Sequence, residues 1–196
     1  PRAAETVYAR KTVPGEATAS EAREFLDKNH MQGWSASKRK FVLRDETGIR
    51  AILTVGPSGR FRYKKTPGAW EILRFATLGS VPGGFTRLLK FAERTLLSEG
   101  VDLRAWETFS SGEYSQGGLY SSVGFTHVRR TDPTYWYFGA ITGWRREPMY
   151  KFQRHIFEQR DDLKYEPGWT ESEAAKANGL EKVWGLPQDF WTKPVK

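Results

Sequence analysis

Hydrophobic positions recur with helical spacing in two stretches of the first hundred residues. Between residues 85 and 97 the apolar side chains fall on one helical face and the charged ones on the other, which predicts an amphipathic helix that ends before Gly100. A second helix is expected to begin at Thr18 or Ser20 and to run to about His30, because acidic residues lie in its first turn and basic ones in its last. Each helix therefore has one face that must pack against a core.

Short apolar runs bounded by glycine, proline and polar turn residues predict the strands. They cover residues 7–12, 41–43, 49–55, 61–63, 70–78, 101–109, 125–128 and 135–138, and a short helix is expected at 117–122. The turn-forming segment 45–48 joins two of these strands into a hairpin. From residue 70 to 138 the order is strand, glycine loop, helix, strand, helix, strand. This order predicts an α/β fold with a mostly parallel or mixed central sheet flanked by helices.

The pattern changes after Gly143, where charged and aromatic residues mix without a regular period. Helices are expected at 149–159 and 171–178, followed by a short apolar piece that ends at Trp184. We therefore expect a core domain over residues 1–140 and a C-terminal extension of helical and irregular structure over residues 141–196, packed on that core.

The composition excludes several classes of protein. The 196 residues contain no cysteine, which excludes disulfides and cysteine-ligated zinc, and the three histidines lie far apart, so no metal site is predicted. No window approaches eighteen consecutive apolar residues, and residues 1–11 mix charges without an apolar stretch, so neither a membrane span nor a secretory signal is expected. The expectation is a cytoplasmic protein with no membrane partner; the sequence predicts no oligomeric state.

The net charge of +8 is unevenly distributed along the chain. Residues 38–65 hold nine Lys and Arg against two Asp and Glu. Such a local excess is typical of a surface that neutralises the phosphates of a nucleic acid, although a solvated basic face has the same composition. The basic residues expected to contact DNA are Arg39, Lys40, Arg60, Arg62, Lys64, Lys65, Arg129 and Arg130.

Three consecutive aromatic residues, Tyr135, Trp136 and Tyr137, follow the last two of these arginines. Aromatic rings stack on nucleobases, so this run is a second candidate for DNA contact. Successive strand residues point to opposite faces, which means that some of the three belong to a core. We expect Trp136 to be buried and Tyr135 and Tyr137 to be available for stacking.

A glycine-bearing loop lies between the longest expected strand and the amphipathic helix. In the segment 81–86, Gly83 and Gly84 precede the helix, so its first amides and the positive end of its dipole are predicted to face outward. Phosphate groups bind such places, although glycines also serve ordinary tight turns.

This loop and the segment 119–125 together resemble the GNAT superfamily of acyl-coenzyme A N-acyltransferases over roughly residues 18–138. The residues that match the layout of that family are Gly83, Gly84, Tyr120, Gly124 and Phe125. The resemblance implies that acetyl-CoA or a related acyl-CoA binds between two strands that separate, with Tyr120 near its thiol as a candidate general acid. The family's loop usually begins with Gln or Arg, where this chain has Ser80, and Phe85 replaces a later Gly or Ala. The predicted cofactor contacts are Ser80, Gly83, Gly84 and Arg74.

Shorter motifs are similar to the Mom-type DNA base-modification proteins of bacteriophages and their phage relatives. These motifs lie at residues 29–30, 73–74, 114–120, 133–137, 152–154 and 179–185. The resemblance implies chemistry on the exocyclic amine of a base in DNA. Such an amine is a poor nucleophile and requires a base that removes its proton.

Two side chains are candidates for that base. His30 titrates near neutral pH, but it can also simply interact with the carbonyls at a helix end. Glu107 is expected at a strand end and is otherwise a surface carboxylate. Arg74 interrupts an apolar strand, so it either pairs with Glu71 or Glu107 or contacts an anionic ligand.

Three functions agree with these observations. The first is a phage-type transferase that modifies an amino group of a DNA base with an acyl-CoA-like donor. The second is a catalytically silent DNA-binding module of the same fold, which the altered loop favours over the third. The third is an ordinary small-molecule or protein N-acetyltransferase.

Overall fold

The computed structural model describes residues 5–59 and 66–195, which form two compact units. The first unit comprises the described parts of 1–109, 117–129 and 190–196, and the second comprises 110–116 and 130–189. The expected boundary after residue 140 falls inside the second unit, and the end of the chain returns to the first.

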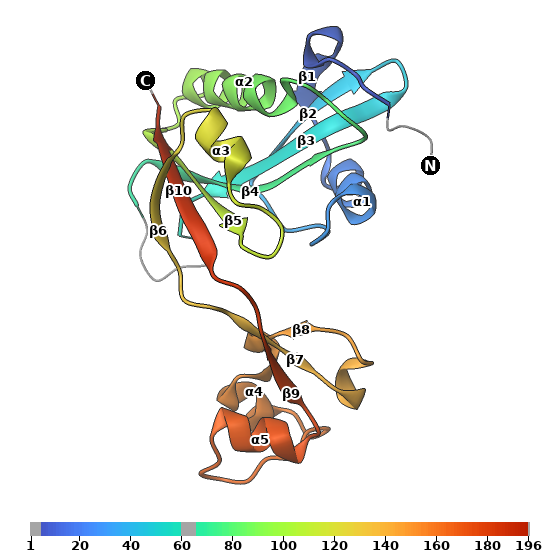
Figure 1. Ribbon diagram of the computed structural model, residues 1–196, viewed down its shortest axis with the longest axis vertical. Helices are drawn as coiled ribbons and strands as arrows, with labels where there is room; N and C mark the ends of the chain where they lie inside the picture. The colour runs from blue at the N-terminus through green and yellow to red at the C-terminus, as the bar shows by residue number, and fades with distance from the viewer. Residues whose placement is uncertain (1–4, 60–65, 196) are drawn as a thin grey trace. The chain divides into compact units, whose positions relative to one another are not determined.

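A seven-stranded sheet carries the first unit (Figure 1). Its strands, in spatial order, are β1 (Val13–Glu16), β2 (Arg39–Asp45), β3 (Gly48–Pro57), β4 (Ala69–Thr77), β5 (Ala105–Ser111), β10 (Gln188–Pro194) and β6 (Thr126–Arg130). The first four pair antiparallel with their neighbours, whereas β4 and β5 are parallel. The sheet is mixed, as predicted, but it is mostly antiparallel rather than mostly parallel.

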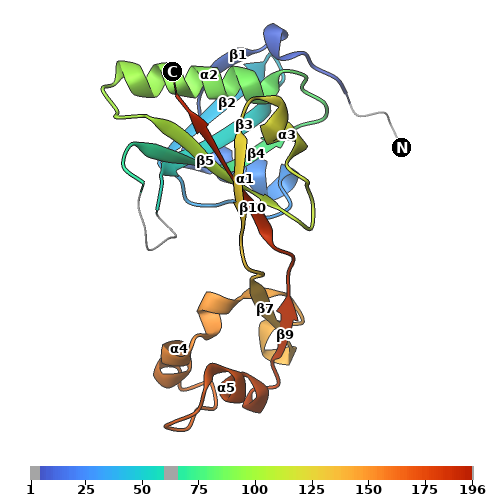
Figure 2. The same cartoon turned by 60° about the vertical axis from the view of Figure 1, so that its left-hand side comes forward.

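Two helices cover opposite faces of this sheet (Figure 2). Helix α2 (Gly84–Ser98) buries its apolar face against one side, and α1 (Ala19–Asn29) packs against the other. The short helix α3 (Gly118–Ser122) follows β5 in the chain. Thr18 begins α1, because its hydroxyl accepts the Glu21 amide while the Glu21 carboxylate accepts the Thr18 amide. All three predicted helices of this unit are confirmed.

The sheet register assigns each β4 side chain to one face. Trp70, Ile72 and Phe75 pack in the cluster beneath α2, and Ala76 packs in the cluster beneath α1. Arg74 pairs with Thr54, two residues after Ile52 of the α1 cluster, so its side chain lies on the α1 face. We refer below to the α1 face and the α2 face of the sheet.

Several predicted elements differ from the structure. The strand expected at 7–12 is replaced by the 3-10 turn η1 (Ala9–Lys11), and the first strand of the sheet comes later, at β1. The helix expected at 149–159 is divided into η3 (Met149–Phe152) and α4 (Arg154–Gln159). Strand β10 was not predicted, although the buried positions of its first four residues alternate. The strand expected at 61–63 lies outside the described residues.

The second unit contains a three-stranded sheet in the order β8 (Glu147–Pro148), β7 (Tyr135–Phe138), β9 (Glu181–Trp184). Helix α5 (Glu171–Ala177) packs with α4 in its core, and the short turn η2 (Ala140–Thr142) follows β7. Tyr137 is the buried member of the aromatic run, with 1% of its surface exposed, while Trp136 is only partly buried. The expected burial of Trp136 is therefore corrected: the strand turns Tyr137 toward the helices.

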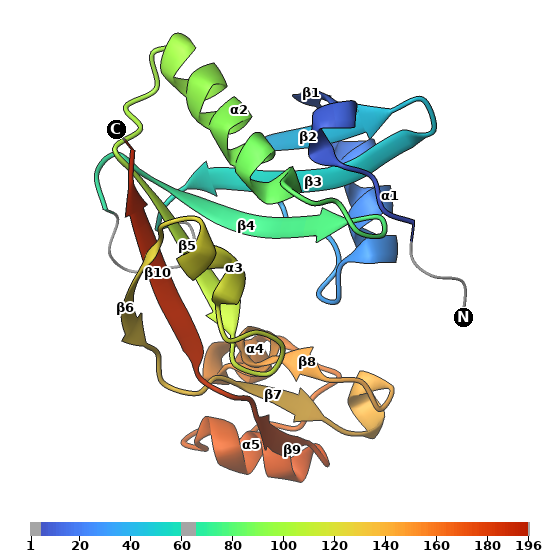
Figure 3. The same ribbon diagram turned by 45° about the horizontal axis from the view of Figure 1, so that its top comes forward.

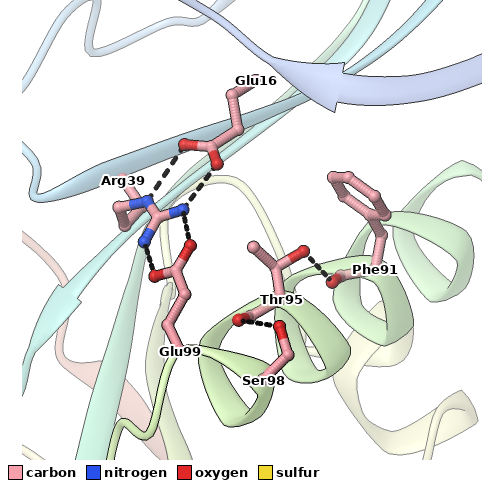
Figure 4. A network of polar contacts seen from close by, with 6 residues as sticks. All are labelled: Glu16, Arg39, Phe91, Thr95, Ser98 and Glu99. Atoms are coloured by element: carbon pink, nitrogen blue, oxygen red, sulfur yellow. Dashed lines mark hydrogen bonds and ion pairs between the residues drawn. The ribbon is translucent and has the colours of Figure 1, made fainter.

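An ion-pair network joins the edge of the large sheet to the end of α2 (Figure 4). The Arg39 guanidinium donates to both oxygens of Glu16 on β1 and to both oxygens of Glu99, the residue that ends α2. The Arg39 side chain is 18% exposed, whereas Glu16 and Glu99 are nearly half exposed, so water reaches the carboxylate side of this network. Arg39 therefore ties two strands to a helix.

In the part of the chain that the structure describes, no helix combines the length and the apolar character needed to cross a lipid bilayer.

Candidate active site

The parallel pair of strands β4 and β5 separates partway along its length (Figure 3). Their register begins at Ala69 opposite Ala105 and ends at Ile72 opposite Thr108. On the other side of β4 the register with β3 shifts, so that Leu73 has no residue opposite it. Leu73 therefore lies where the β4 register has no partner on either side; because its carbonyl accepts the Arg74 side chain, its amide is the group there that could serve a ligand.

Tyr120 of α3 lies at this separation on the α2 face. Its ring packs against Phe85, Phe125 and Trp191. Its hydroxyl lies beside the Thr108 side chain, whose hydroxyl donates to the Ile72 carbonyl at 3.2 Å. Burial raises the pKa of the Tyr120 hydroxyl, so at neutral pH it carries its proton.

Two carboxylates lie next to each other on the α1 face, just before the strands separate. Glu71 and Glu107 are opposite each other in the parallel register, and neighbouring strands lie about 4.8 Å apart. Both residues are buried, with 8% and 5% of their surface exposed. The Ser58 hydroxyl donates to Glu107. The alternative of a surface carboxylate is therefore wrong for Glu107, because β5 is interior to the sheet.

Arg74 lies on the same face, immediately after Leu73. Its Nη1 donates to the Leu73 carbonyl at 2.7 Å and its Nε donates to the Gly33 carbonyl at 3.2 Å. Burial lowers the pKa of the guanidinium, and the charge of Glu71 opposes that shift. Within residues 5–59 and 66–195, no carboxylate lies close enough to form an ion pair with it.

His30 ends α1 on the same face. Its amide donates to the Leu26 carbonyl at 2.8 Å, and its Nδ1 accepts the Gln32 amide at 3.1 Å. Burial, together with the nearby charge of Arg74, lowers the pKa of the imidazole to about 4. The neutral ring with Nδ1 as acceptor carries its proton on Nε2, so the free nitrogen is a donor rather than a base.

The predicted phosphate loop joins β4 to α2. Gly83 is exposed and has a left-handed φ of 78°, which directs the chain into the helix. The amides of Ser80 and Gly84 donate to the carbonyls of Glu5 and Val81. Those of Gly83, Phe85 and Thr86 have no partner among the described residues. Three amides at the positive end of a 15-residue helix are thus available for an anion.

The segment from Glu5 to Ala9 lies against this loop. Besides the bond to the Glu5 carbonyl, Val7 donates to Ser80 at 2.9 Å and Ala9 donates to Pro82 at 3.0 Å. Gly79 permits the close approach, because a Cβ there would lie 2.4 Å from the Glu5 carbonyl oxygen. The beginning of the chain therefore holds the loop in place.

The four predicted cofactor residues do not form one group. Ser80, Gly83 and Gly84 lie together in the loop, but Arg74 lies within β4, six residues before Ser80, and its side chain is on the α1 face. Arg74 instead shares the α1 face with His30 and the two glutamates. The Tyr120 ring packs in the cluster on the α2 face, although the charge of Arg74 also acts on its hydroxyl.

The predicted DNA-binding cations have different surroundings. Arg39 is engaged by two carboxylates, and Arg130 pairs with Asp189 at 3.0 Å. Arg129 lies over the Phe190 ring, and Lys40 has no ion-pair partner among the described residues. Arg60, Arg62, Lys64 and Lys65 lie outside the described residues.

The two predicted stacking tyrosines share one partner. The hydroxyls of Tyr135 and Tyr137 donate to the same Glu171 oxygen at 2.6 and 2.7 Å. Burial and this carboxylate raise the pKa of both, that of Tyr135 to about 12. Tyr137 is too deeply buried to receive a nucleobase. Tyr135 is only partly buried, but Lys182 lies over its ring and Trp184 packs against it.

Sequence reasoning missed three members of the site. The sequence indicates Glu71 only as a partner for Arg74, although two charged residues within the apolar run 70–78 are themselves a signal of function. Nothing in the sequence marked Ser58 or Thr108. Within the described residues, no three His, Cys, Asp or Glu side chains are grouped so as to bind a metal ion.

No protein-family model matches the chain, and no curated protein sequence matches it. Two solved structures are similar in fold. The ribosomal-protein-S18-alanine N-acetyltransferase from Escherichia coli superposes with a TM-score of 0.51 at 12% identity, covering 94% of each chain. The protein yncA from Salmonella typhimurium, assigned as an acetyltransferase and solved with its cofactor acetyl-CoA, gives a TM-score of 0.51 at 9% identity, covering 95% of each chain. With the mixed sheet, its separating strands and its flanking helices, these likenesses show that the chain has the acyl-CoA N-acyltransferase fold of the GNAT type.

Proposed function

We propose that this protein is an N-acyltransferase that moves an acyl group from an acyl-CoA donor to an amine. The observation that carries the proposal is the arrangement at the separation of β4 and β5. A protonated tyrosine lies on one face of the sheet and two buried carboxylates lie on the other. An amine and a thioester bound between these faces would have the carboxylates as proton acceptor on one side and the tyrosine as proton donor on the other.

The residues around the loop fit such a donor. The open amides of Gly83, Phe85 and Thr86 suit the pyrophosphate of coenzyme A, and the dipole of α2 favours its negative charge. The Leu73 amide lies where an acyl carbonyl oxygen would need a donor. When bound, the donor supplies an activated thioester carbonyl.

The side chains divide the proton transfers between them. As the amine nitrogen bonds to the acyl carbon, its proton passes to the Glu107 carboxylate, with Glu71 beside it. As the bond from that carbon to sulfur breaks, the Tyr120 hydroxyl gives its proton to the departing sulfur. Thr108 lies beside the Tyr120 hydroxyl at the separation, and His30 contributes a donor at Nε2.

For the acceptor we propose an amino group of a DNA base, as in phage-type base modification. Counted over the full sequence, the first unit contains 22 Lys and Arg against 12 Asp and Glu. The second unit contains 9 Lys and Arg against 11 Asp and Glu. The unit that carries the candidate active site thus also carries the excess positive charge, which favours a polyanionic substrate. The short motifs similar to Mom-type proteins support the same acceptor. A base in a duplex would have to leave the stack to reach the site.

The test combines donor binding with product analysis. Acetyl-CoA should raise the thermal midpoint of the purified protein, because a ligand that binds only the folded state stabilises it. DNA from cells that express the protein should contain a new acylated nucleoside, detected by mass spectrometry. Tyr120→Phe should lower its amount by about 100-fold, and Tyr150→Phe, a change at an exposed tyrosine of the second unit, should leave it unchanged.

Other outcomes assign one of the remaining functions. DNA binding without stabilisation by acetyl-CoA would indicate a catalytically silent DNA-binding module. Stabilisation by acetyl-CoA together with an unmodified nucleoside profile and no DNA affinity would indicate an ordinary small-molecule or protein N-acetyltransferase.

A further inference from the structure

Arg74 is a half-buried cation whose contacts leave part of its guanidinium unused. Its Nε and Nη1 donate to the carbonyls of Gly33 and Leu73, which fixes the direction of the side chain. Its Nη2 has no partner among the described residues, and no described carboxylate is within ion-pair distance. A cation taken out of water without an ion-pair partner is costly, so such an arginine is expected to serve an anionic ligand.

The surroundings of Arg74 place that ligand on the α1 face. Gly33 donates its amide to the His30 carbonyl, so the turn after α1 and the guanidinium are joined through one backbone unit. His30 offers a second donor at Nε2 beside the same turn. The charged groups that oppose an anion here are Glu71 and Glu107, which lie on the same face before the strands separate.

The position of Arg74 does not suit the pyrophosphate of the donor, because its side chain lies on the α1 face, whereas the glycine loop leads into α2, which packs on the other face. It is adjacent instead to the carboxylates that would accept the proton of the amine. An anion bound by Arg74 therefore belongs to the acceptor molecule and lies a short distance from its reacting nitrogen.

We propose that Arg74 forms an acceptor subsite for a phosphodiester group of the nucleic acid that carries the target amine. The inference rests on the proposed function for the identity of the acceptor. Every base in a DNA strand has a phosphodiester on either side of its sugar, and a planar guanidinium held by two carbonyls presents its remaining N–H groups to phosphate oxygens. The subsite positions the strand so that the amine of the extruded base meets the carboxylates on the α1 face.

Calorimetric titration with a dinucleotide that has a single phosphodiester tests the proposal. The control ligand is the same dinucleotide with an uncharged methylphosphonate linkage. The full-length protein should bind the phosphodiester about tenfold more tightly than the methylphosphonate, since one charge-assisted contact is lost in the neutral analogue. Arg74→Gln should abolish this preference, and Arg74→Lys should retain part of it. Arg94→Gln, at an exposed arginine of α2, should keep it in full.

Several outcomes would overturn the subsite. One is equal binding of the two dinucleotides by the unmodified protein. Another is an undiminished preference for the phosphodiester in a folded Arg74→Gln variant. If Arg74→Gln does not fold, Arg74→Lys takes its place, and a full tenfold preference for the phosphodiester in that variant would overturn the subsite. A nucleoside 5′-monophosphate that binds as tightly as the dinucleotide would overturn the assignment to a nucleic acid strand and indicate a free nucleotide. The stabilisation of each protein by acetyl-CoA is measured on the same samples. If acetyl-CoA does not stabilise the protein but the preference for the phosphodiester is intact, acyl transfer is refuted and the subsite is not.

Discussion

The imidazole of His30 lies at the end of α1, and both the burial of the ring and the positive charge of Arg74 favour its neutral form. Its pKa of about 4 in the folded protein is below the value near 6.5 of an unfolded chain. The unfolded state therefore binds the proton first as the pH falls. The contribution of His30 to stability is complete above pH 6.5 and is lost progressively toward pH 4.

This linkage gives a prediction for acid stability. The shift corresponds to at most about 3.4 kcal/mol, and because the ring is only half-buried, solvent screening reduces it to about 1–2 kcal/mol. Urea unfolding at pH 7 and pH 4.5 should show that the free energy of unfolding falls by that much more in the unmodified protein than in His30→Gln. The exposed His155→Gln serves as control. Identical pH dependence in all three proteins would contradict the assigned environment of His30.

Residue types alone selected several residues that the fold then brings near one another. Tyr120, Glu107, Arg74 and His30 all lie around the separation of β4 and β5, although on two faces of the sheet. The residue types did not indicate the protonation state or the accessibility of these side chains. Both depend on burial and on hydrogen bonds that the fold creates. The Gln32 amide on Nδ1 of His30 and the burial of Tyr137 are examples.

At the scale of elements, the loop between β4 and α2 depends on the segment that precedes β1. Three backbone hydrogen bonds join that segment to the loop, and one of them occupies the amide of Ser80. Gly79 has a φ of +72° and no room for a Cβ beneath the Glu5 carbonyl. The glycine is therefore required both for its conformation and for the close approach of the chain.

Replacing this glycine should affect donor binding through the loop. Gly79→Ala should destabilise the protein by about 2–4 kcal/mol, from left-handed strain plus the steric conflict, and should weaken the binding of acetyl-CoA several-fold. Gly100→Ala is a matched control, because Gly100 has a φ of +77° but open space around it. It should cost only about 1 kcal/mol and leave acetyl-CoA affinity unchanged. Thermal unfolding and calorimetry measure both; equal effects of the two substitutions would refute the role of the segment.

Helix α1 illustrates what local sequence fixes at this scale. The Thr18–Glu21 capping box and the acidic first turn operate within four residues, so both the start and the direction of the helix follow from the sequence. Strand β10 is different, because it joins the sheet between β5 and β6 only after the chain has passed through the second unit. Pairing of that kind depends on residues about eighty positions away.

Over the whole molecule, the excess positive charge belongs to the first unit, but some of it is neutralised by ion pairs inside that unit. Arg39, Arg44 and Arg50 of the basic stretch all contact carboxylates. The charge of a stretch in the sequence therefore overstates the charge available to a ligand.

The salt dependence of the proposed DNA binding should separate the two kinds of cation. Lys40→Gln should reduce the slope of log affinity against log salt by about 1, because Lys40 has no described ion-pair partner. Arg39→Gln should leave that slope unchanged and lower the thermal midpoint instead, since its charge already serves Glu16 and Glu99. Fluorescence anisotropy at several salt concentrations measures the slopes. A reduction in Arg39→Gln as large as that in Lys40→Gln would assign Arg39 to the DNA surface.

The sequence by itself determined the amphipathic helices, the hairpin of β2 and β3, the glycine turn before α2 and the mixed sheet, because each follows from periodicity or turn chemistry within a few residues. The tertiary structure decided that β4 and β5 separate after Ile72, that Glu71 and Glu107 lie side by side, and that Arg74 lies on the α1 face of the sheet. It also decided which cations are already paired. These features arise from strand register and from contacts across the sheet, and register depends on how distant segments pack together rather than on the order of residues within any one of them.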